Sequence, residues 1–212
     1  MYIPPRYRVT DDATIDALLR AHGFGTLISH GSGGLMATHL PFELSYATDG
    51  TRRLSGHVSK ANPQWRQLEE AGEALIVVLG PHTYISPTWY DHPNVPTWNY
   101  QAVHAYGAVR TLHGPHELTT ALRPLAEHYE PPEQPEPRFD LDRMPPDLRA
   151  AELRGIVGFE LRVTRVEAAF KLSQNRNEGD QAEIVAQLRA RGDDASRAIA
   201  DAMQVRPRES GP

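Results

Sequence analysis

The sequence predicts a mostly β protein, a small antiparallel barrel with peripheral helices. Segments typical of strands follow one another more often than they alternate with helices, which argues against a doubly wound parallel sheet. The 212 residues include 16 glycines and 18 prolines, so turns are frequent. A barrel of this size is filled by its own side chains, and a ligand would therefore bind its outer wall or a boundary between subunits.

Six or seven segments carry the periodicity or the apolar composition of strands. The run at 74–79 is apolar throughout, which indicates a buried strand, and 100–112 alternates between two faces. We expect a turn at Gly80–Pro81 and a strand that is broken near Pro41. The predicted strands cover 25–29, 35–45, 54–59, 74–79, 83–86, 100–112 and 156–172.

Helices are expected between and after these strands. Asn62 followed by Pro63 favours a helix start, because asparagine caps helices well and proline suits the first helical position. Gly192 is expected to split a helical tail into two pieces. The segment 130–146, rich in proline and charge, predicts an irregular surface excursion, and 205–212 are expected to fray. The predicted helices cover 12–22, 63–70, 117–128, 147–153 and 179–204.

Composition and charge exclude several classes of function. The formal net charge of −5 excludes a diffusely basic nucleic-acid-binding surface, although not a local basic patch. The absence of cysteine excludes disulfides and thiolate chemistry, and the ten histidines show no metal-binding spacing, so no metal is expected. No apolar run suits a membrane span or a secretion signal, so we expect a cytoplasmic protein without membrane contact.

The segment 56–63, GHVSKANP, is the strongest local candidate for a binding site. A strand ends here, and Ser59 and Lys60 follow at its exit before a helix begins at Asn62. The start of a helix favours a phosphate, to which lysine adds a charge and serine a hydroxyl. Lys60 is one of only two lysines among 22 basic residues. The alternative is that Asn62 only caps the helix and that Lys60 is solvated.

A loop rich in proline and aromatic residues at 81–100 is the second candidate. It holds two of the three tryptophans and three of the eight tyrosines, among them Trp98 and Tyr84. Such rings could stack on a flat ligand or form a dimer contact. Ordinary packing over the barrel is an equally open interpretation.

A third candidate, KLSQNR at 171–176, places polar donors such as Lys171 and Gln174 at a strand end. A solvated turn is the simpler interpretation. His39 and His57 lie on predicted strands, where a structural hydrogen bond is the more common role. No serine lies in a GxSxG or SxxK context, so no catalytic residue is assigned.

Six motifs, taken in their order along the chain, carry a resemblance to a known family. They are MYIPPRY at the start, HLPFEL (39–44), GHVSKANPQW (56–65), GPHTYISPTWY (80–90), VPTWNYQAVHAYG (95–107) and KLSQNR (171–176). From residue 1 to about 190 the sequence closely resembles the PaiB family, bacterial FMN-binding proteins described as negative transcriptional regulators. The resemblance implies an FMN-binding antiparallel split β-barrel, similar to pyridoxamine-phosphate-oxidase-like proteins, and usually a homodimer with two sites at the interface.

The resemblance also implies which residues contact FMN. Ser59 and Lys60 would contact the phosphate, while Tyr84 and Trp98 would lie near the ring or the ribityl chain, in one arrangement contributed by the second subunit. Residues of the third motif would be secondary contacts. The FMN-binding residues implied in this way are Thr38, His39, His57, Ser59, Lys60, Asn62, Tyr84, Trp98, Asn99, Lys171 and Gln174.

The expected organisation is a split-barrel domain over 1–175 and a helical tail over 176–212. The resemblance implies an FMN-binding homodimer that regulates transcription negatively. Between 178 and 209 the tail has seven acidic residues and five arginines, so its charge does not support contact with DNA. The alternative is a flavin-dependent oxidoreductase, of the FMN reductase or oxidase type, without direct DNA binding. A haem-binding variant is a third interpretation.

Overall fold

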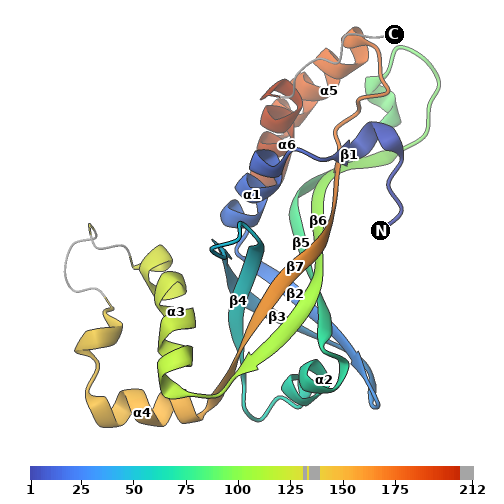
Figure 1. Ribbon diagram of the computed structural model, residues 1–212. Coiled ribbons are helices and arrows are strands. Elements are labelled where there is room, and N and C mark those ends of the chain that lie inside the picture. Colours follow the sequence, from blue (N-terminus) through green and yellow to red (C-terminus); the bar gives the residue numbers. More distant parts are fainter. Residues whose placement is uncertain (131–132, 134–138, 206–212) are drawn as a thin grey trace. The chain divides into compact units, whose positions relative to one another are not determined.

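The computed structural model describes residues 1–130, 133 and 139–205 (Figure 1). Residues 131–132 and 134–138 of the predicted excursion at 130–146, and residues 206–212 of the predicted frayed end, therefore lie outside the described residues. Contacts divide the chain into two units, each described here by itself. The first unit comprises Met1–Ile15, Leu79–Val103 and Glu167–Pro212, and the second comprises Asp16–Val78 and His104–Val166. The division at residue 175 stays a prediction.

The described strands form an antiparallel sheet that closes on itself. They are β1 (Arg8–Val9), β2 (Phe24–Gly31), β3 (Gly34–Tyr46), β4 (Arg52–Ser59), β5 (Glu73–Ile85), β6 (Thr97–Leu112) and β7 (Ile156–Lys171). Their hydrogen-bonded order is β1-β7-β4-β3-β2-β5-β6, and β6 also pairs with β7. Six strands therefore close a barrel, and β1 pairs with the outer part of β7. The predicted mostly β, antiparallel barrel is confirmed.

The described α-helices lie close to their predicted ranges. They are α1 (Asp12–Ala21), α2 (Gln64–Ala71), α3 (Pro115–Tyr129), α4 (Pro146–Arg154), α5 (Glu178–Arg191) and α6 (Asp194–Val205). The Asn62 side chain accepts a hydrogen bond from the Gln64 backbone N–H at 2.9 Å, as expected of a cap. Gly192, with φ +74°, ends α5 and separates it from α6, as predicted. No helix in the described part of the chain is long and apolar enough to cross a membrane.

The interior of the second unit is filled by the inward faces of its strands. Alternate residues of β2, β3 and the first half of β5 are buried, which follows from the two-residue repeat of a strand. Each large side chain removed from water in this way contributes about 1.5–3 kcal/mol. The fully buried large side chains of these strands are Leu27, Phe42, Leu54, Ile76, Leu112, Phe159 and Leu161.

Two strands continue through prolines at which the sequence predicted an interruption. β3 pairs with β2 as far as Pro41 opposite Phe24 and with β4 from Phe42 opposite Gly56. Pro41 thus lies where β3 changes partner, and its missing N–H leaves no bond of either ladder unmade. The turn predicted at Gly80–Pro81 is wrong, because β5 continues to Ile85.

Glycine is required where β6 and β7 approach each other. A Cβ atom on Gly107 of β6 would lie 2.0 Å from the carbonyl oxygen of Arg162 and 3.0 Å from the Cα of Val163, both in β7. The Thr164 hydroxyl also donates to the Tyr106 carbonyl at 3.3 Å. The two strands therefore touch here backbone to backbone.

The first unit holds both ends of the described chain. β1 pairs with the end of β7, with Arg8 opposite Ala169, and the terminal amine of Met1 forms an ion pair with Glu167. α5 and α6 each bury one face, with Ile184 and Ile199 fully buried. The residues after β7 are thereby packed into a helical pair.

Candidate functional site

The corner after β4, formed by Ser59 and Lys60, has a backbone that is fixed by hydrogen bonds to a neighbouring segment of the chain. Ser59 pairs with Ile156 of β7, and the Lys60 N–H donates to the carbonyl of Gly155 at 2.8 Å. The Ser59 hydroxyl accepts from the N–H of Ala61 at 3.3 Å. The Lys60 side chain is exposed, and no ion-pair partner for its amine is found among the described residues. The corner thus presents a hydroxyl and a free cation from a fixed backbone.

Thr38 and Asn62 are joined beside this corner. The Asn62 amide donates to the Thr38 hydroxyl at 2.9 Å, and that hydroxyl donates to the side-chain carbonyl of Gln64. Gln64 is fully buried, and its amide also donates to the carbonyl of Leu27 at 3.0 Å. Sequence reasoning missed Gln64, because its partners lie on strands far away in the chain. This glutamine ties the start of α2 to β2 and β3.

The two predicted histidines of this unit differ in their surroundings. His39 is exposed on β3, and its Nδ1 lies 2.9 Å from the Thr26 hydroxyl. His57 on β4 is half-buried, and its buried Nδ1 has no hydrogen-bond partner among the described residues. Burial lowers the pKa of His57 below the usual 6.5, so its imidazole is neutral at pH 7. An unpaired buried nitrogen costs about 1–3 kcal/mol, so a ligand that paired it would be stabilised.

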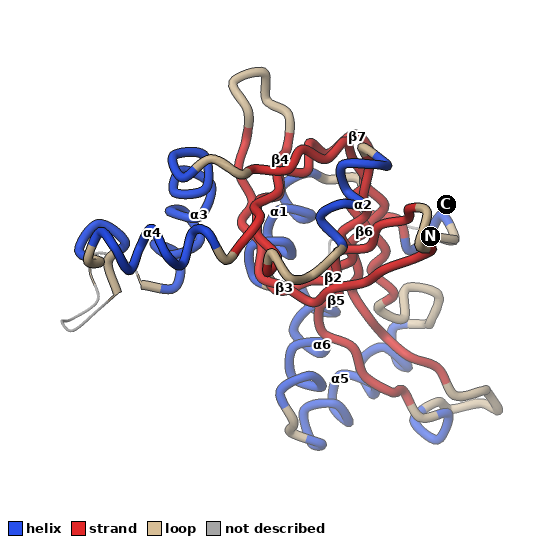
Figure 2. The backbone as a smooth tube through the Cα atoms, turned by 90° about the horizontal axis from the view of Figure 1, so that it is seen from below, coloured by secondary structure: helices blue, strands red, loops and turns tan. Residues whose placement is uncertain are grey.

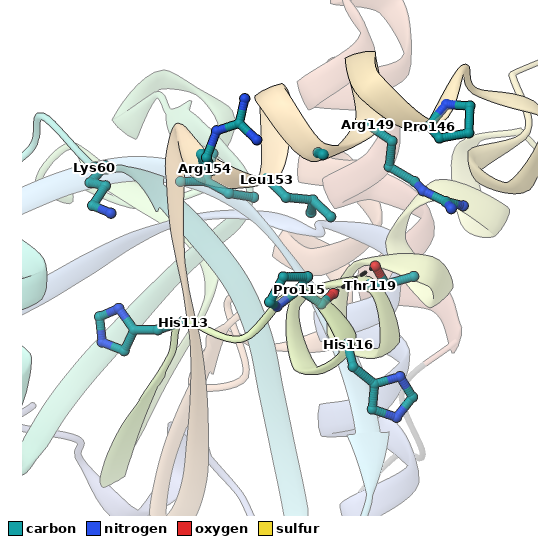
Figure 3. Close-up of a pocket in the computed structure, with 11 residues that line it drawn as sticks. Lys60, His113, Pro115, His116, Thr119, Pro146, Arg149, Leu153 and Arg154 are labelled. Carbon is teal, nitrogen blue, oxygen red and sulfur yellow. Dashed lines mark hydrogen bonds between the residues drawn. The ribbon is translucent and has the colours of Figure 1, made fainter.

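An open pocket of about 610 Å³ adjoins the corner within the second unit (Figure 3). Lys60 lies at one end, and the other walls come from α3, α4 and the residues before α3. Among the described residues no carboxylate lines it. The basic side chains that line it are Lys60, His113, His116, Arg149 and Arg154. The pocket therefore suits an anion, and the two arginines were not among the predicted site residues.

Two predicted aromatic residues of the first unit form a small exposed group. Trp98 is 53% exposed and Tyr84 is 39% exposed. Their rings meet edge to face with centroids 6.2 Å apart, and the His82 ring lies 6.2 Å from Trp98. The group therefore offers aromatic surface to a partner molecule or a flat ring.

The other predicted residues of the first unit have contacts within the chain. Asn99 is fully buried and exchanges two hydrogen bonds with Ser173, at 3.0 and 3.1 Å. The Lys171 amine donates to the Thr97 hydroxyl, and burial, followed by the charge of Arg176, lowers the pKa of Lys171. These contacts tie the end of β7 to the start of β6.

Gln174 closes the turn that follows β7. Its side-chain carbonyl accepts from the Leu172 N–H at 2.6 Å, and its amide donates to the Phe170 carbonyl at 2.5 Å. The predicted site residues thus fall into two groups, and their assignment to FMN stays a prediction. The second unit contains Thr38, His39, His57, Ser59, Lys60 and Asn62, and the first contains Tyr84, Trp98, Asn99, Lys171 and Gln174.

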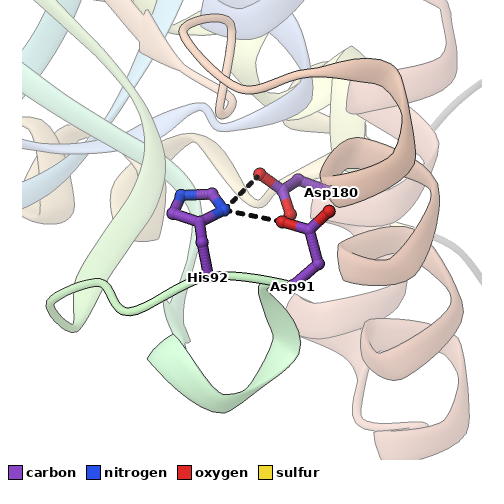
Figure 4. Close-up of side chains that lie close together, drawn as sticks. All are labelled: Asp91, His92 and Asp180. Carbon is purple, nitrogen blue, oxygen red and sulfur yellow. Dashed lines mark hydrogen bonds and ion pairs between the residues drawn. The ribbon is translucent and has the colours of Figure 1, made fainter.

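Three potential metal ligands, Asp91, His92 and Asp180, meet in the first unit (Figure 4). The His92 Nδ1 lies 2.7 Å from the Asp91 carboxylate and 3.8 Å from that of Asp180. Asn94 places its amide nitrogen 3.2 Å from the His92 Nε2 and uses its carbonyl oxygen to accept from the Val95 N–H. Nε2 is therefore an acceptor and Nδ1 carries the proton. One hydrogen bond therefore joins His92 to Asp91 within the loop, and a longer contact of 3.8 Å reaches Asp180 at the start of α5.

Comparison with known proteins identifies the family. The model of the family described as "Putative FMN-binding domain" matches residues 1–165. Protease synthase and sporulation protein PAI 2 from Bacillus subtilis (strain 168) is 39% identical over 207 residues, which cover 96% of this chain and 97% of that protein. The chain belongs to the PaiB family. This PaiB-family protein has FMN as its cofactor, as predicted.

Solved structures identify the fold of the PaiB-family protein. The flavocytochrome Anf3 from Azotobacter vinelandii matches with a TM-score of 0.60 and 18% identity, covering 83% of this chain and 75% of that one. An FAD and haem binding protein from Mycobacterium smegmatis matches with a TM-score of 0.58 and 17% identity, covering 78% and 73%. The predicted split-barrel fold is therefore confirmed.

Proposed function

We propose that this PaiB-family protein is an FMN-binding homodimer that regulates transcription negatively without contacting DNA through its tail. The observation that carries the proposal is the Ser59–Lys60 corner, where the exposed Lys60 amine borders a pocket that no carboxylate of the described residues lines, next to the hydroxyl of Ser59. FMN, when bound, supplies reversible electron and hydride transfer. The chain supplies its position and its electrostatic surroundings.

The residues of the corner fit the phosphate end of FMN. A phosphate monoester carries a charge of about −1.5 to −2 at pH 7 and three acceptor oxygens. Lys60 offers a cation and Ser59 offers a hydroxyl, whereas the Thr38 hydroxyl already donates its hydrogen to Gln64. His57 and Ser59 share one face of β4, because they are two residues apart on a strand. The unpartnered Nδ1 of His57 supports a ligand group on this face.

An apolar outer face of the second unit supports the homodimer. β2 lies between β3 and β5 (Figure 2), and Ile28 pairs with Ala37 on one side and Leu75 on the other. Leu35 is 75% exposed and Phe24 is 62% exposed on the same strands. The paired Thr26 and His39 lie between Phe24 and Ile28 on this face, so its apolar side chains are interspersed with polar ones. Large exposed apolar side chains on one face of a sheet favour an interface between proteins. A second copy of the chain would cover it.

Leu35→Arg is expected to convert the dimer into a monomer of 23.6 kDa. An arginine on this face would be desolvated without a partner at the interface, whereas the free subunit tolerates it because the position is exposed. Sedimentation velocity measures the change. Val205→Arg, at a position 83% exposed on α6, is the matched control and should remain a dimer. A Leu35→Arg protein that still sediments as a dimer would refute this interface.

The arginines in the described part of the tail support regulation without direct DNA contact. Arg189 donates to Gln204 at 2.6 Å, and Arg197 donates to Asp194 at 2.6 Å. Arg191 donates to the Thr83 hydroxyl at 3.0 Å. Cations that are engaged within the chain bind phosphates weakly, because their partners must first be displaced. The flavin-bound state would therefore act through another partner.

The neutral imidazole of His57 favours a second candidate, a flavin-dependent oxidoreductase, because such a group can accept a proton. Transcript levels in a deletion strain complemented with the wild type or with Lys60→Ala separate the two functions. Regulation by the FMN-bound protein predicts that only the wild type restores repression. Unchanged transcripts, together with bleaching of the flavin absorbance by NADH or NADPH, would favour the oxidoreductase.

A further inference from the structure

The pocket beside Lys60 has more positive charge than one phosphate monoester requires. Lys60, Arg149 and Arg154 give three permanent charges, against the two or fewer negative charges of a monoester. Of the two imidazoles in the lining, that of His113 is already engaged, with its Nε2 2.8 Å from the Glu69 carboxylate, and that of His116 adds further nitrogen atoms. In the described part of the chain no carboxylate lines the pocket to balance them.

Few carboxylates neutralise the charges of the two arginines of α4. Arg154 has no ion-pair partner among the described residues, and it directly precedes Gly155, whose carbonyl accepts from the Lys60 N–H. Arg149 lies 3.7 Å from Asp142. The Asp142 carboxylate is already bound by both guanidinium nitrogens of Arg123, at 2.8 and 2.9 Å. Arg149 and Arg154 are therefore available to an anion.

Apart from Thr119, the remaining lining is apolar and indicates an organic ligand. Figure 3 shows Arg149 and Leu153 directed from α4 toward α3, with Lys60 at the far end. The pocket of about 610 Å³ is far larger than a phosphate ion and lies in the usual range for small-molecule sites. The apolar lining residues are Pro115, Pro146, Ala150, Leu153 and Ile156.

We propose that this pocket binds a second phosphate-bearing ligand of the nucleotide class, with Arg149 and Arg154 as its phosphate-binding residues. The apolar lining would contact the base or sugar, and the arginines would bind the phosphates. The inference rests on the proposed function in one respect, namely that the FMN phosphate occupies the Lys60 end. The nucleotide would then lie beside the cofactor rather than in its place.

The test is a calorimetric titration of the FMN-saturated protein with ADP. We expect ADP to bind and adenosine to give no heat, because the arginines recognise phosphate. The double variant Arg149→Gln with Arg154→Gln should weaken ADP binding by about a hundredfold, as two charge-assisted contacts are lost. Quenching of the fluorescence of bound FMN should be unchanged. Arg143→Gln, outside the pocket lining, is the matched control and should bind ADP like the wild type.

Three results would overturn the proposal. They are no heat with ADP, displacement of FMN by ADP, and equal ADP affinity in the wild type and in Arg154→Gln. If the double variant does not fold, the ADP affinity of Arg154→Gln alone tests the proposal. A protein that binds ADP through α4 but takes up no FMN would refute the FMN assignment at Lys60 and leave the nucleotide site in place. Uptake of FMN without ADP binding would refute only the nucleotide site.

Discussion

Lys60→Ala is expected to weaken FMN binding about 10- to 100-fold, because the phosphate loses a charge-assisted contact worth about 1.5–3 kcal/mol. The Lys60 amine is exposed and, among the described residues, unpaired, so its whole hydrogen-bonding capacity is available to a ligand. Lys171 is the natural comparison, since it is the other lysine of the chain. Its half-buried amine already donates to Thr97. Lys171→Ala should therefore change FMN affinity by about threefold or less.

Quenching of flavin fluorescence during titration with protein gives both affinities. Lys60→Arg should recover part of the loss, because a guanidinium keeps the charge at a different position. Circular dichroism melting of each variant separates a binding defect from unfolding. Equal affinity of the wild type and Lys60→Ala would show that the phosphate binds elsewhere. A larger loss of FMN affinity in Lys171→Ala than in Lys60→Ala would indicate that the phosphate binds in the first unit.

Gly107→Ala should destabilise the protein by about 3 kcal/mol or more, an effect at the upper end for a single methyl group. The added Cβ would lie 2.0 Å from the Arg162 carbonyl oxygen and 2.7 Å from its carbonyl carbon. Both are backbone atoms of β7, so a side-chain rotation cannot relieve the overlap. The two strands must separate, and the closure of the barrel is lost with them.

The midpoint of urea unfolding measures this effect. Gly33→Ala is the control, because the nearest atom to its Cβ is the side-chain nitrogen of Gln67 at 3.4 Å, the end of a flexible side chain. Its unfolding free energy should change by about 0.5 kcal/mol or less. If Gly107→Ala and Gly33→Ala unfold at the same urea concentration, β6 and β7 are not in contact at Gly107.

The barrel was predictable because the local sequence pattern of each strand indicates it. The apolar run at 74–79 and the alternation at 100–112 correspond to β5 and β6. The predicted break at Pro41 does not occur. Whether a proline interrupts a strand depends on which neighbouring strand pairs with it, and no local sequence pattern specifies the neighbour. The turn expected at Gly80–Pro81 is absent for the same reason. β5 continues through Pro81, which lies beyond the residues of β5 that pair with β2.

The candidate site was predictable only where its residues are neighbours in the chain. Ser59 and Lys60 follow one strand and precede one helix, so their placement needs no long-range contact. The buried pair of Asn99 and Ser173 joins residues 74 positions apart, and nothing in either segment marks it. The arginines of α4 come to Lys60 through the pairing of β4 with β7, which periodicity alone does not specify.

The pairing of β7 also constrains the order of events during synthesis. β2 and β3 form a hairpin closed by a tight turn, with Gly31 opposite Gly34, so they can associate soon after they leave the ribosome. β7 must meet β4 and β1, which precede it by roughly a hundred residues or more. The barrel consequently stays open until β7 has been translated, and β7 is made after every other strand of the described residues.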